Sequence, residues 1–177
     1  ILAVNKEAFM VVHPTRNIEG GTLSNGVANY FQTLGLMRKV RVVTRLDRDT
    51  TGVVIFAKNS FSHQQLAYQL ENNIFKKYYL ALVKGKVNFT SITIDTPIIK
   101  SEDGIHQKTS HDGREAITHV DVIKVFDDYS LLMVKIDTGR THQIRVHLQS
   151  IGHPILGDGL YGYGSEIINR QALHAFK

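Results

Sequence analysis

The chain has 177 residues and no cysteine, which excludes disulfides, thiolate metal sites and cysteine nucleophiles. Hydrophobic residues make up 42% and charged residues 21%, as in a globular chain and unlike a disordered one. A net charge of +5 favours an anionic partner, of which nucleic acid is the commonest. No apolar run approaches the ~20 residues that span a bilayer, and no signal segment opens the chain, so we expect a cytoplasmic protein without membrane contact.

Positive charge is concentrated in two stretches. One contains five basic residues within eleven positions: Arg38, Lys39, Arg41, Arg45 and Arg48. The other lies between Glu71 and Asp95 and contains lysines with no carboxylate among them: Lys76, Lys77, Lys84 and Lys86. This distribution strengthens the expectation of a nucleic-acid partner.

The first half of the chain predicts strands around a short helix. Apolar or β-branched segments typical of strands are residues 1–4, 9–12, 40–44 and 52–56. A helix is expected from Thr22 to about Phe31, closed by Gly35. The polar residues 45–51 must then form a loop between two apolar strands.

Two more helices are predicted. Ser60 caps the first, which runs to about Asn73 and buries the face that carries Leu66 and Leu70. The second begins at a Thr141 cap, has apolar residues at helical spacing, and ends at a Gly and a Pro. Strand-like alternation competes within the second segment, but its stop signal favours a helix.

The remaining segments indicate local strand pairing. Strands are expected at residues 77–83, 116–126 and 131–136. Residues 100–114 are polar and rich in turn formers, which predicts a loop. Because strands cluster instead of alternating strictly with helices, we expect an α+β fold with a largely antiparallel mixed β-sheet and flanking helices. No repeat or linker divides the chain, so we expect one domain.

The charged loop around Asp47 is the first candidate site. Residues 45–49, Arg-Leu-Asp-Arg-Asp, place two carboxylates beside two guanidinium groups. Nearby positive charge favours an ionised carboxylate, which suits a nucleophile or an electrostatic stabiliser more than a general acid. The alternative is that Asp47 and Asp49 only make turn hydrogen bonds and surface ion pairs.

The second candidate is the segment from Thr138 to His147. It is dense in hydrogen-bonding side chains, among them Arg140, His142, Gln143 and Arg145. Arginine suits bidentate pairing to a carboxylate or a phosphate. The alternative is a helix whose polar face is merely solvated. The histidines lack the i, i+4 spacing of helical metal ligands, so we expect no metal site.

The third candidate is Lys77-Tyr78-Tyr79. Adjacent tyrosines on a strand face opposite ways, so one of them is expected in the core and the other to be available. An aromatic ring beside a basic strand can stack on an unpaired base. A plain core tyrosine is the alternative.

One motif points elsewhere. Residues 47–51 fit D-x-D-x-T, which resembles the signature of magnesium-dependent haloacid-dehalogenase-like phosphatases, and Asp127-Asp128 resembles their later metal-binding pair. Those enzymes need a parallel sheet with alternating strands and helices. Here a strand is expected to resume directly at Gly52, so the phosphatase remains a minority alternative.

Taken in order, three long motifs resemble the RluA-like family of RNA pseudouridine synthases. Arg45-Leu46-Asp47 with Thr51-Gly52 resembles the family's R-L-D-x-x-[ST]-[ST]-G signature, and residues 77–85 resemble its K-x-Y-x-A-L-V-x-G strand. Residues 138–147 and 152–162 resemble its T-G-R-T-H-Q-I-R-V-H and G-H-P-I-x-G-D-x-x-Y-G block. The likeness covers nearly the whole chain. It departs at Thr44, where a histidine is usual, and at Thr51, where serine is commoner.

The resemblance implies roles for particular residues. Asp47 would be the essential catalytic aspartate, Arg145 its ion-pair partner, and Tyr79 the aromatic residue packed against the target uracil. Arg45 matches an arginine that, in some members, enters the RNA where the uridine has left. Further candidates for substrate binding are Lys77, Arg140, His142 and Gln143.

The same resemblance implies an isomerase that needs no cofactor, with a central catalytic cleft and ribosomal or transfer RNA as its partner. We expect residues 1–177 to be a single catalytic domain, monomeric, trimmed at both ends and without a visible S4 domain. A non-catalytic RNA-binding domain is the main competing hypothesis.

Overall fold

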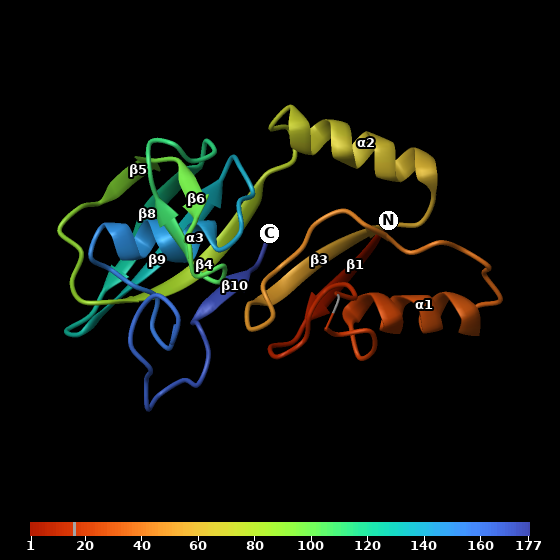
Figure 1. Ribbon diagram of the computed structural model, residues 1–177, viewed down its shortest axis with the longest axis horizontal. Coiled ribbons are helices and arrows are strands. Elements are labelled where there is room, and N and C mark those ends of the chain that lie inside the picture. The colour runs from red at the N-terminus through yellow and green to blue at the C-terminus, as the bar shows by residue number, and fades with distance from the viewer. Residues whose placement is uncertain (16) are drawn as a thin grey trace. The chain divides into compact units, whose positions relative to one another are not determined.

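The computed structural model describes residues 1–15 and 17–177, and its contacts divide the chain into two compact units (Figure 1). Unit 1 comprises Ile1–Phe75 and unit 2 comprises Lys76–Lys177. In each unit the strands pair antiparallel and at least one helix packs against them, which confirms the expected α+β class. Within the described residues, no helix has the length and apolar character needed to cross a bilayer.

The sheet of unit 1 is built around β3 (Thr51–Ala57), with β1 (Leu2–Lys6) and β2 (Arg41–Val42) both antiparallel to it. Helix α1 (Leu23–Thr33) and helix α2 (Ser60–Glu71) lie on opposite sides of these strands (Figure 1). In the core of the unit, Val27 and Phe31 of α1 pack against Val54 and Phe56 of β3.

Helix α1 has the ends that its sequence predicts. The Thr22 side chain accepts a hydrogen bond from the Asn25 N–H, and the Asn25 side-chain oxygen accepts one from the Thr22 N–H, so two backbone donors at the start of the helix are satisfied. Gly35, at φ 67°, closes the helix in a left-handed conformation. The N–H of Leu36 then reaches the carbonyl of Phe31 at 2.9 Å, the pattern of a Schellman motif.

Two expectations for unit 1 are wrong. Residues 9–12 form no strand, because Phe9 sits in a turn at φ 62°; the apolar run is explained by Val12, which is buried in the core. Helix α2 is capped by Asn59, one residue before Ser60, through a 2.8 Å bond from the Ser62 N–H. It also contains no fully buried residue, so its predicted apolar face is only half-covered.

Unit 2 contains a fully antiparallel five-stranded sheet in the order β10-β4-β9-β8-β5. The bounds are β4 Lys77–Lys84, β5 Ser91–Asp95, β8 Ile117–Val125, β9 Tyr129–Ile136 and β10 Leu173–Ala175. Directly paired residues share a face, so the register Tyr79–Val134–Val120 places these three on one side. Thr118 lies on that side too, paired with Ile136, and it contacts α3.

Helix α3 (Gln143–Ser150) is buried through six consecutive residues, from Gln143 to Leu148. It starts from His142 in a left-handed conformation at φ 55°, without a side-chain cap, so the predicted Thr141 cap is wrong. The Gln143 side chain accepts the Arg140 N–H at 2.9 Å and so closes this turn from inside the helix. The predicted stop is confirmed: Gly152 lies at φ 82°, and the His153 N–H bonds the Leu148 carbonyl at 3.0 Å.

Residues 100–114, expected as a loop, include part of a hairpin made of β6 (Ile98–Lys100) and β7 (Gln107–Thr109). Its turn is closed by the Asp103 carboxylate, which accepts the N–H groups of Ile105 and His106. Gly113 lets the chain return against Ile98, since a Cβ there would lie 2.6 Å from the Ile98 backbone. The turn formers of residues 100–114 concealed the polar strand β7, whereas its partner β6 is anchored by the buried Ile98.

Candidate functional site

The Asp47 loop is fixed by the residues on either side of Asp47. Leu46 packs against the core of unit 1, which directs the chain inward immediately before Asp47. The Asp47 carbonyl then accepts the Thr50 N–H at 3.2 Å, forming a tight turn ahead of β3, and Thr50 is buried. Asp47 itself is half-buried and Arg45 is exposed. The backbone at position 47 is therefore set by packing and turn geometry.

A buried lysine also stabilises this loop. The Lys6 ammonium, at the end of β1, is only 1% exposed and donates to the carbonyls of Glu7, Met10 and Arg48 at 2.7, 2.8 and 2.8 Å. An ammonium has three donor hydrogens, so this arrangement suits its full capacity. Lys6 was not among the predicted residues; its signal is a charged residue at the end of a strand, on the half-buried face of Leu2 and Val4.

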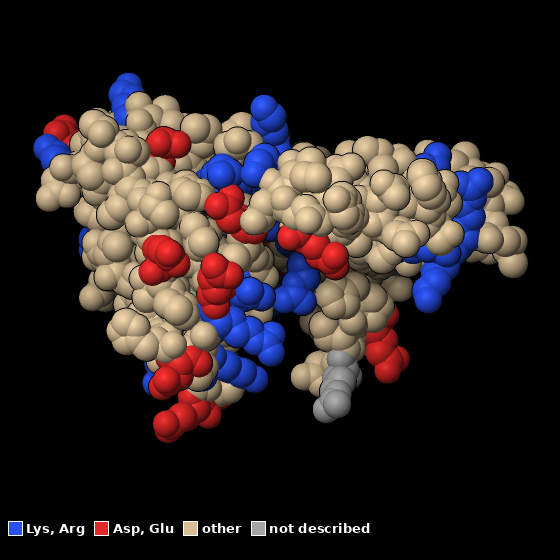
Figure 2. Space-filling model, turned by 90° about the horizontal axis from the view of Figure 1, so that it is seen from above, with Lys and Arg blue, Asp and Glu red and all other residues tan. Residues whose placement is uncertain are grey.

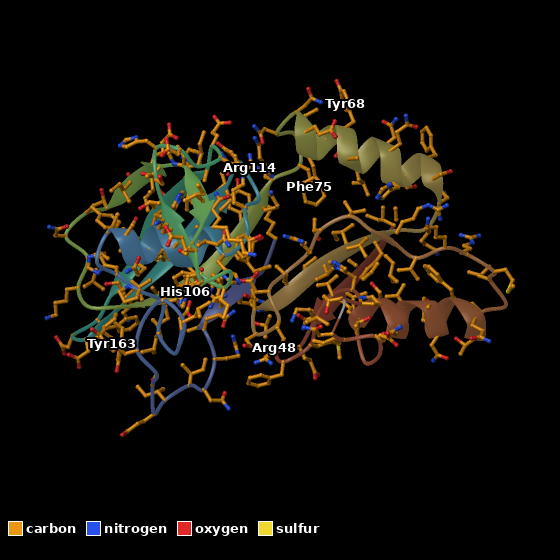
Figure 3. All side chains as sticks on the ribbon, in the orientation of Figure 1. Arg48, Tyr68, Phe75, His106, Arg114 and Tyr163 are labelled. Carbon is orange, nitrogen blue, oxygen red and sulfur yellow. The ribbon has the colours of Figure 1, made fainter. Side chains whose placement is uncertain are left out.

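The second carboxylate of the loop, Asp49, bonds to its neighbour. The Arg48 guanidinium meets Asp49 through two hydrogen bonds, of 2.8 and 3.2 Å, and this bond raises the pKa of Arg48 further. Figure 3 places Arg48 near the beginning of β3. For Asp49, the structure therefore confirms the alternative given in the sequence analysis, a surface ion pair.

Thr44, where the resemblance expects histidine, has a local structural role. Its hydroxyl accepts the Ile55 N–H at 2.9 Å, where the pairing of β2 with β3 ends. The hydroxyl therefore satisfies a strand donor just before the Asp47 loop.

In unit 2, the first two candidates lie on β4. Tyr79 is only 7% exposed and shares the α3 side of the sheet with Lys77, while Tyr78 points to the other side, where its ring centroid lies 6.3 Å from that of Phe176. The expectation that the two tyrosines face opposite ways is confirmed. The Lys77 ammonium donates to the Thr138 carbonyl at 3.4 Å, and burial lowers the pKa of Lys77, with Asp137 acting in the opposite direction.

A buried ion pair fixes Arg145. Its Nε and Nη2 atoms donate to the two carboxylate oxygens of Asp158 at 2.7 and 2.8 Å, and Asp158 is 1% exposed. Asp158 also accepts the N–H groups of Leu160 and Tyr161. Burial by itself would raise the pKa of Asp158, but these bonds outweigh it and hold that pKa below its usual value. The planar fork leaves Arg145 little rotational freedom.

Tyr161 connects this ion pair to His142. The Arg145 guanidinium carbon lies 4.9 Å from the Tyr161 ring centroid, a cation–π contact. The Tyr161 hydroxyl accepts the Gln107 N–H at 2.8 Å and also lies 2.8 Å from His142 Nδ1, within hydrogen-bonding distance. Asp158 and Tyr161 belong to the third motif but were not predicted as site residues.

Gln143 uses its whole side-chain amide within the protein. Its oxygen accepts from the Thr138 hydroxyl and the Arg140 N–H at 2.8 and 2.9 Å. Its nitrogen donates to the Ile117 carbonyl and the Thr118 hydroxyl, both at 3.0 Å. These bonds tie the turn before α3 to β8. Arg140 is held there as well, because its Nε donates to the Glu115 carbonyl at 2.8 Å.

The predicted site residues thus fall into two groups. Asp47 and Arg45 belong to the loop of unit 1. Within unit 2, the Thr138 carbonyl meets Lys77 and the Thr138 hydroxyl meets Gln143, while Tyr161 links His142 to Arg145. In residues 1–15 and 17–177, no three His, Asp or Glu side chains are grouped so that they could bind a metal ion.

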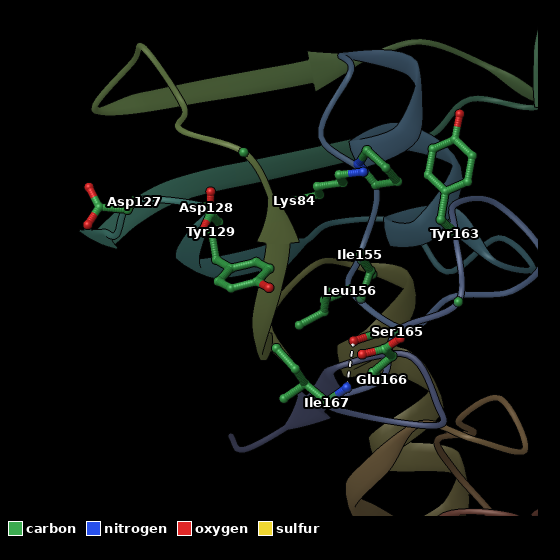
Figure 4. A pocket seen from close by; sticks show the side chains of 13 residues that line it. Lys84, Asp127, Asp128, Tyr129, Ile155, Leu156, Tyr163, Ser165, Glu166 and Ile167 are labelled. Carbon is green, nitrogen blue, oxygen red and sulfur yellow. Dashed lines mark hydrogen bonds between the residues drawn. The ribbon is translucent and has the colours of Figure 1, made fainter.

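A cavity of about 520 Å³ in unit 2 is separate from these residues (Figure 4). It lies beside the turn between β8 and β9, and its walls include Lys84, Tyr129, Leu156 and Tyr163. Its acidic lining residues, Asp127, Asp128 and Glu166, would repel a phosphate. None of the predicted site residues lines it.

Comparison with known proteins identifies the family of the chain. A family model described as RNA pseudouridylate synthase matches residues 1–150. The uncharacterized RNA pseudouridine synthase YhcT of Bacillus subtilis is 44% identical over 182 residues, which cover 100% of this chain and 60% of that protein. Ribosomal large subunit pseudouridine synthase D of Nitrosomonas europaea is 39% identical over 189 residues, covering 100% of this chain and 54% of that protein.

A solved structure agrees. Human RNA pseudouridylate synthase domain containing 1 has a TM-score of 0.79 and 26% identity, over 98% of this chain and 72% of that one. The chain spans about three fifths of the length of the curated relatives that it matches most strongly.

Proposed function

Since the chain belongs to the RNA pseudouridylate synthase family, we propose that it isomerises specific uridines of structured RNA to pseudouridine. The reaction breaks the bond between ribose C1′ and uracil N1, turns the base, and forms a bond between C1′ and C5. The proton on C5 leaves and N1 gains one, so atoms and electrons balance without an oxidant or reductant. No cofactor is required by this chemistry.

In this proposal, Asp47 acts as an anionic nucleophile or base at the ribose or the base. Arg145 acts as the ion-pair partner of Asp47, as the family resemblance implies. Tyr79 packs against the target uracil after the nucleotide has left its stack, which offsets part of the few kcal/mol that flipping costs. Arg45 enters the RNA at the position that the uridine has vacated.

Lys77, Arg140 and His142 contact the RNA around the flipped nucleotide. Phosphate and sugar contacts of this kind orient the nucleic acid without specifying its sequence. The filled hydrogen-bonding capacity of Gln143 favours a positioning role for this residue, since its amide holds the turn that carries Arg140 and His142.

One observation carries the proposal: the matched region, residues 1–150, includes Asp47, Tyr79 and Arg145. The fixed backbone around Asp47 and the buried ion pair of Arg145 support it, because groups that act on a substrate need preorganised positions.

Ribosomal RNA is the substrate that we favour, because several relatives are named as ribosomal large subunit pseudouridine synthases. Transfer RNA is the other substrate class that we consider. A ribosomal substrate places the activity in the cytoplasm, and the proposal requires one copy of the chain.

The phosphatase alternative does not fit the fold. Its motif requires a parallel sheet, whereas the strands in both units pair antiparallel. Asp127, half of its supposed metal pair, lies on an exposed turn and bonds Lys86 at 3.1 Å.

The direct test replaces Asp47 by Asn and follows pseudouridine formation in ribosomal RNA from cells that lack this gene. We expect activity to fall by at least about 10³, while thermal stability and RNA affinity stay close to those of the unsubstituted chain. Asp49→Asn is the matched control, and we expect it to stay active because its carboxylate pairs only with Arg48 in the loop.

Pseudouridine formed by Asp47→Asn at the normal rate would overturn the assignment of Asp47. An unsubstituted chain that binds ribosomal RNA but never forms pseudouridine would favour the non-catalytic RNA-binding alternative. Product formed in the presence of EDTA would separately exclude the phosphatase chemistry.

A further inference from the structure

The basic stretch that begins at Arg38 is divided by the fold into two separate places. Arg45 and Arg48 accompany Asp47 in the loop before β3. Arg41 instead pairs with Ala57, the last residue of β3, at the opposite end of that strand. A strand of seven residues rises about 3.3 Å per residue, so the two ends are about 20 Å apart.

A lysine that is remote in sequence joins the far group. Lys58 follows β3 directly, and its carbonyl accepts a hydrogen bond from Arg38 Nη1 at 3.4 Å. Arg41 in turn donates to the Lys39 carbonyl at 3.0 Å. We call these four residues the distal basic cluster: Arg38, Lys39, Arg41 and Lys58.

The distal basic cluster lacks acidic neighbours. No Asp or Glu occurs between Glu19 and Asp47, or between Asp49 and Glu71, so the segments that form this end of unit 1 contribute no negative charge. None of the four side chains forms an ion pair within the described part of the chain. Arg38 and Lys39 are exposed. Figure 2 shows the Lys and Arg side chains gathered at the end of unit 1 where α2 begins, with no acidic group among them.

We propose that the distal basic cluster is a second RNA-binding site, which holds phosphates of the substrate backbone away from the target uridine. The inference rests on the proposed function for the identity of the partner. A span of about 20 Å corresponds to at least about six base steps of a duplex, since the rise per step is at most about 3.4 Å. The cluster therefore engages a stem that flanks the target nucleotide, and it contributes affinity without sequence readout.

The test compares two RNA hairpins with the same uridine-containing loop, one with a stem of about 4 base pairs and one of about 12. Only the longer stem can extend from Asp47 to the cluster. We measure the dissociation constant of each between about 50 and 200 mM salt for the unsubstituted chain and for the double variant R38Q/K39Q. The double variant K86Q/K124Q removes the same charge from the β8–β9 end of unit 2 and is the matched control.

For the longer stem, loss of two phosphate contacts lowers the slope of log affinity against log salt by about 1.8. Over this salt range, the unsubstituted chain then loses about tenfold more affinity than R38Q/K39Q does. We expect little change for the shorter stem, and little for K86Q/K124Q with either RNA.

Equal effects of R38Q/K39Q on both stems, or no effect on either, would overturn the proposal. So would an equal effect of K86Q/K124Q, which would indicate a response to net charge alone. A last measurement follows binding of the chain to phosphatidylglycerol vesicles. If R38Q/K39Q abolished that binding and left the RNA affinity unchanged, the cluster would be a membrane-binding site instead. Because these readouts are affinities, a failure of pseudouridine formation would leave the comparison intact.

Discussion

The Asp47 loop and the Arg145 helix position their charged side chains by different means. Around Asp47, backbone carbonyls help to fix the chain, because they accept hydrogen bonds from the Lys6 ammonium and from the Thr50 N–H. Around Arg145, the contacts are made by the charged side chains themselves, through a bidentate pair with Asp158. The backbone contacts around Asp47 do not involve its carboxylate, whereas the contact between Arg145 and Asp158 depends on both charged side chains.

This difference explains why Asp47→Asn is expected to leave the fold intact. It also predicts that substitutions in the Arg145 network affect stability and activity together. Three further substitutions test the contrast, in order of decreasing effect.

Asp158→Asn should have the largest effect on stability. It removes the charge of Asp158 from a buried ion pair with Arg145, and removing one partner of such a pair costs about 3–5 kcal/mol. Urea unfolding should show this loss in the free energy of unfolding, and pseudouridine formation should fall as well because Arg145 is no longer held. Asp127→Asn, at an exposed carboxylate paired with Lys86, is the control and should be silent. A fully stable Asp158→Asn variant would contradict the contrast.

Lys6→Met should have an intermediate effect. The methionine keeps a long apolar stem but leaves the carbonyls of Met10 and Arg48 without this donor, which costs about 1–3 kcal/mol. Because these bonds hold the Asp47 loop, we expect a lower kcat for pseudouridine formation together with the lower stability. Lys100→Met, at an exposed position, is the control. Unchanged kcat in Lys6→Met would show that the loop is held without the ammonium.

His147 should give the smallest effect, visible as a pH dependence. Its ring is fully buried between the Thr118 hydroxyl and the Thr96 carbonyl, and burial lowers the pKa of His147, an effect that the Thr96 carbonyl partly opposes. The unfolded chain binds a proton at about pH 6.5 and the folded chain only at lower pH, so stability is complete above pH 6.5 and falls as the pH drops below it.

The expected loss is up to about 1.4 kcal/mol per pH unit, measured by urea unfolding between about pH 7 and pH 5. His147→Gln should flatten this dependence, while the exposed His111→Gln should not. A pH profile that His147→Gln leaves unchanged would assign the acid sensitivity to other groups.

Much of the fold was predictable because it depends on local signals. Helix α1 begins at Thr22 and is closed by Gly35 as expected, and Gly152 closes α3. Alternating β4 and β9 were found because every second residue is buried. The predictions failed where packing overrides propensity. In residues 9–12, the apolar run includes Val12, which is buried in the core although the segment forms no strand. In the β6–β7 hairpin, Gly113 closely approaches Ile98, a contact that the sequence does not reveal.

The candidate site was predictable to a similar extent. The motifs identified Asp47, Tyr79 and Arg145 as the residues to examine, and the roles of these three remain predictions. Sequence patterns did not reveal that Lys6 supports the loop or that Asp158 and Tyr161 fix Arg145. These contacts join residues that are far apart along the chain, and no periodicity connects them.

The amino-acid sequence by itself determined the family, the antiparallel α+β class, both ends of α1 and the C-terminal end of α3, since each follows from residue type at short spacing. The tertiary structure alone decided which charges are buried in pairs and which remain together on the surface. It divided one basic stretch between the two ends of β3 and brought Lys58 to the far one. The physical reason is that a strand separates its ends by a fixed rise per residue, whereas neighbours across a fold are set by packing.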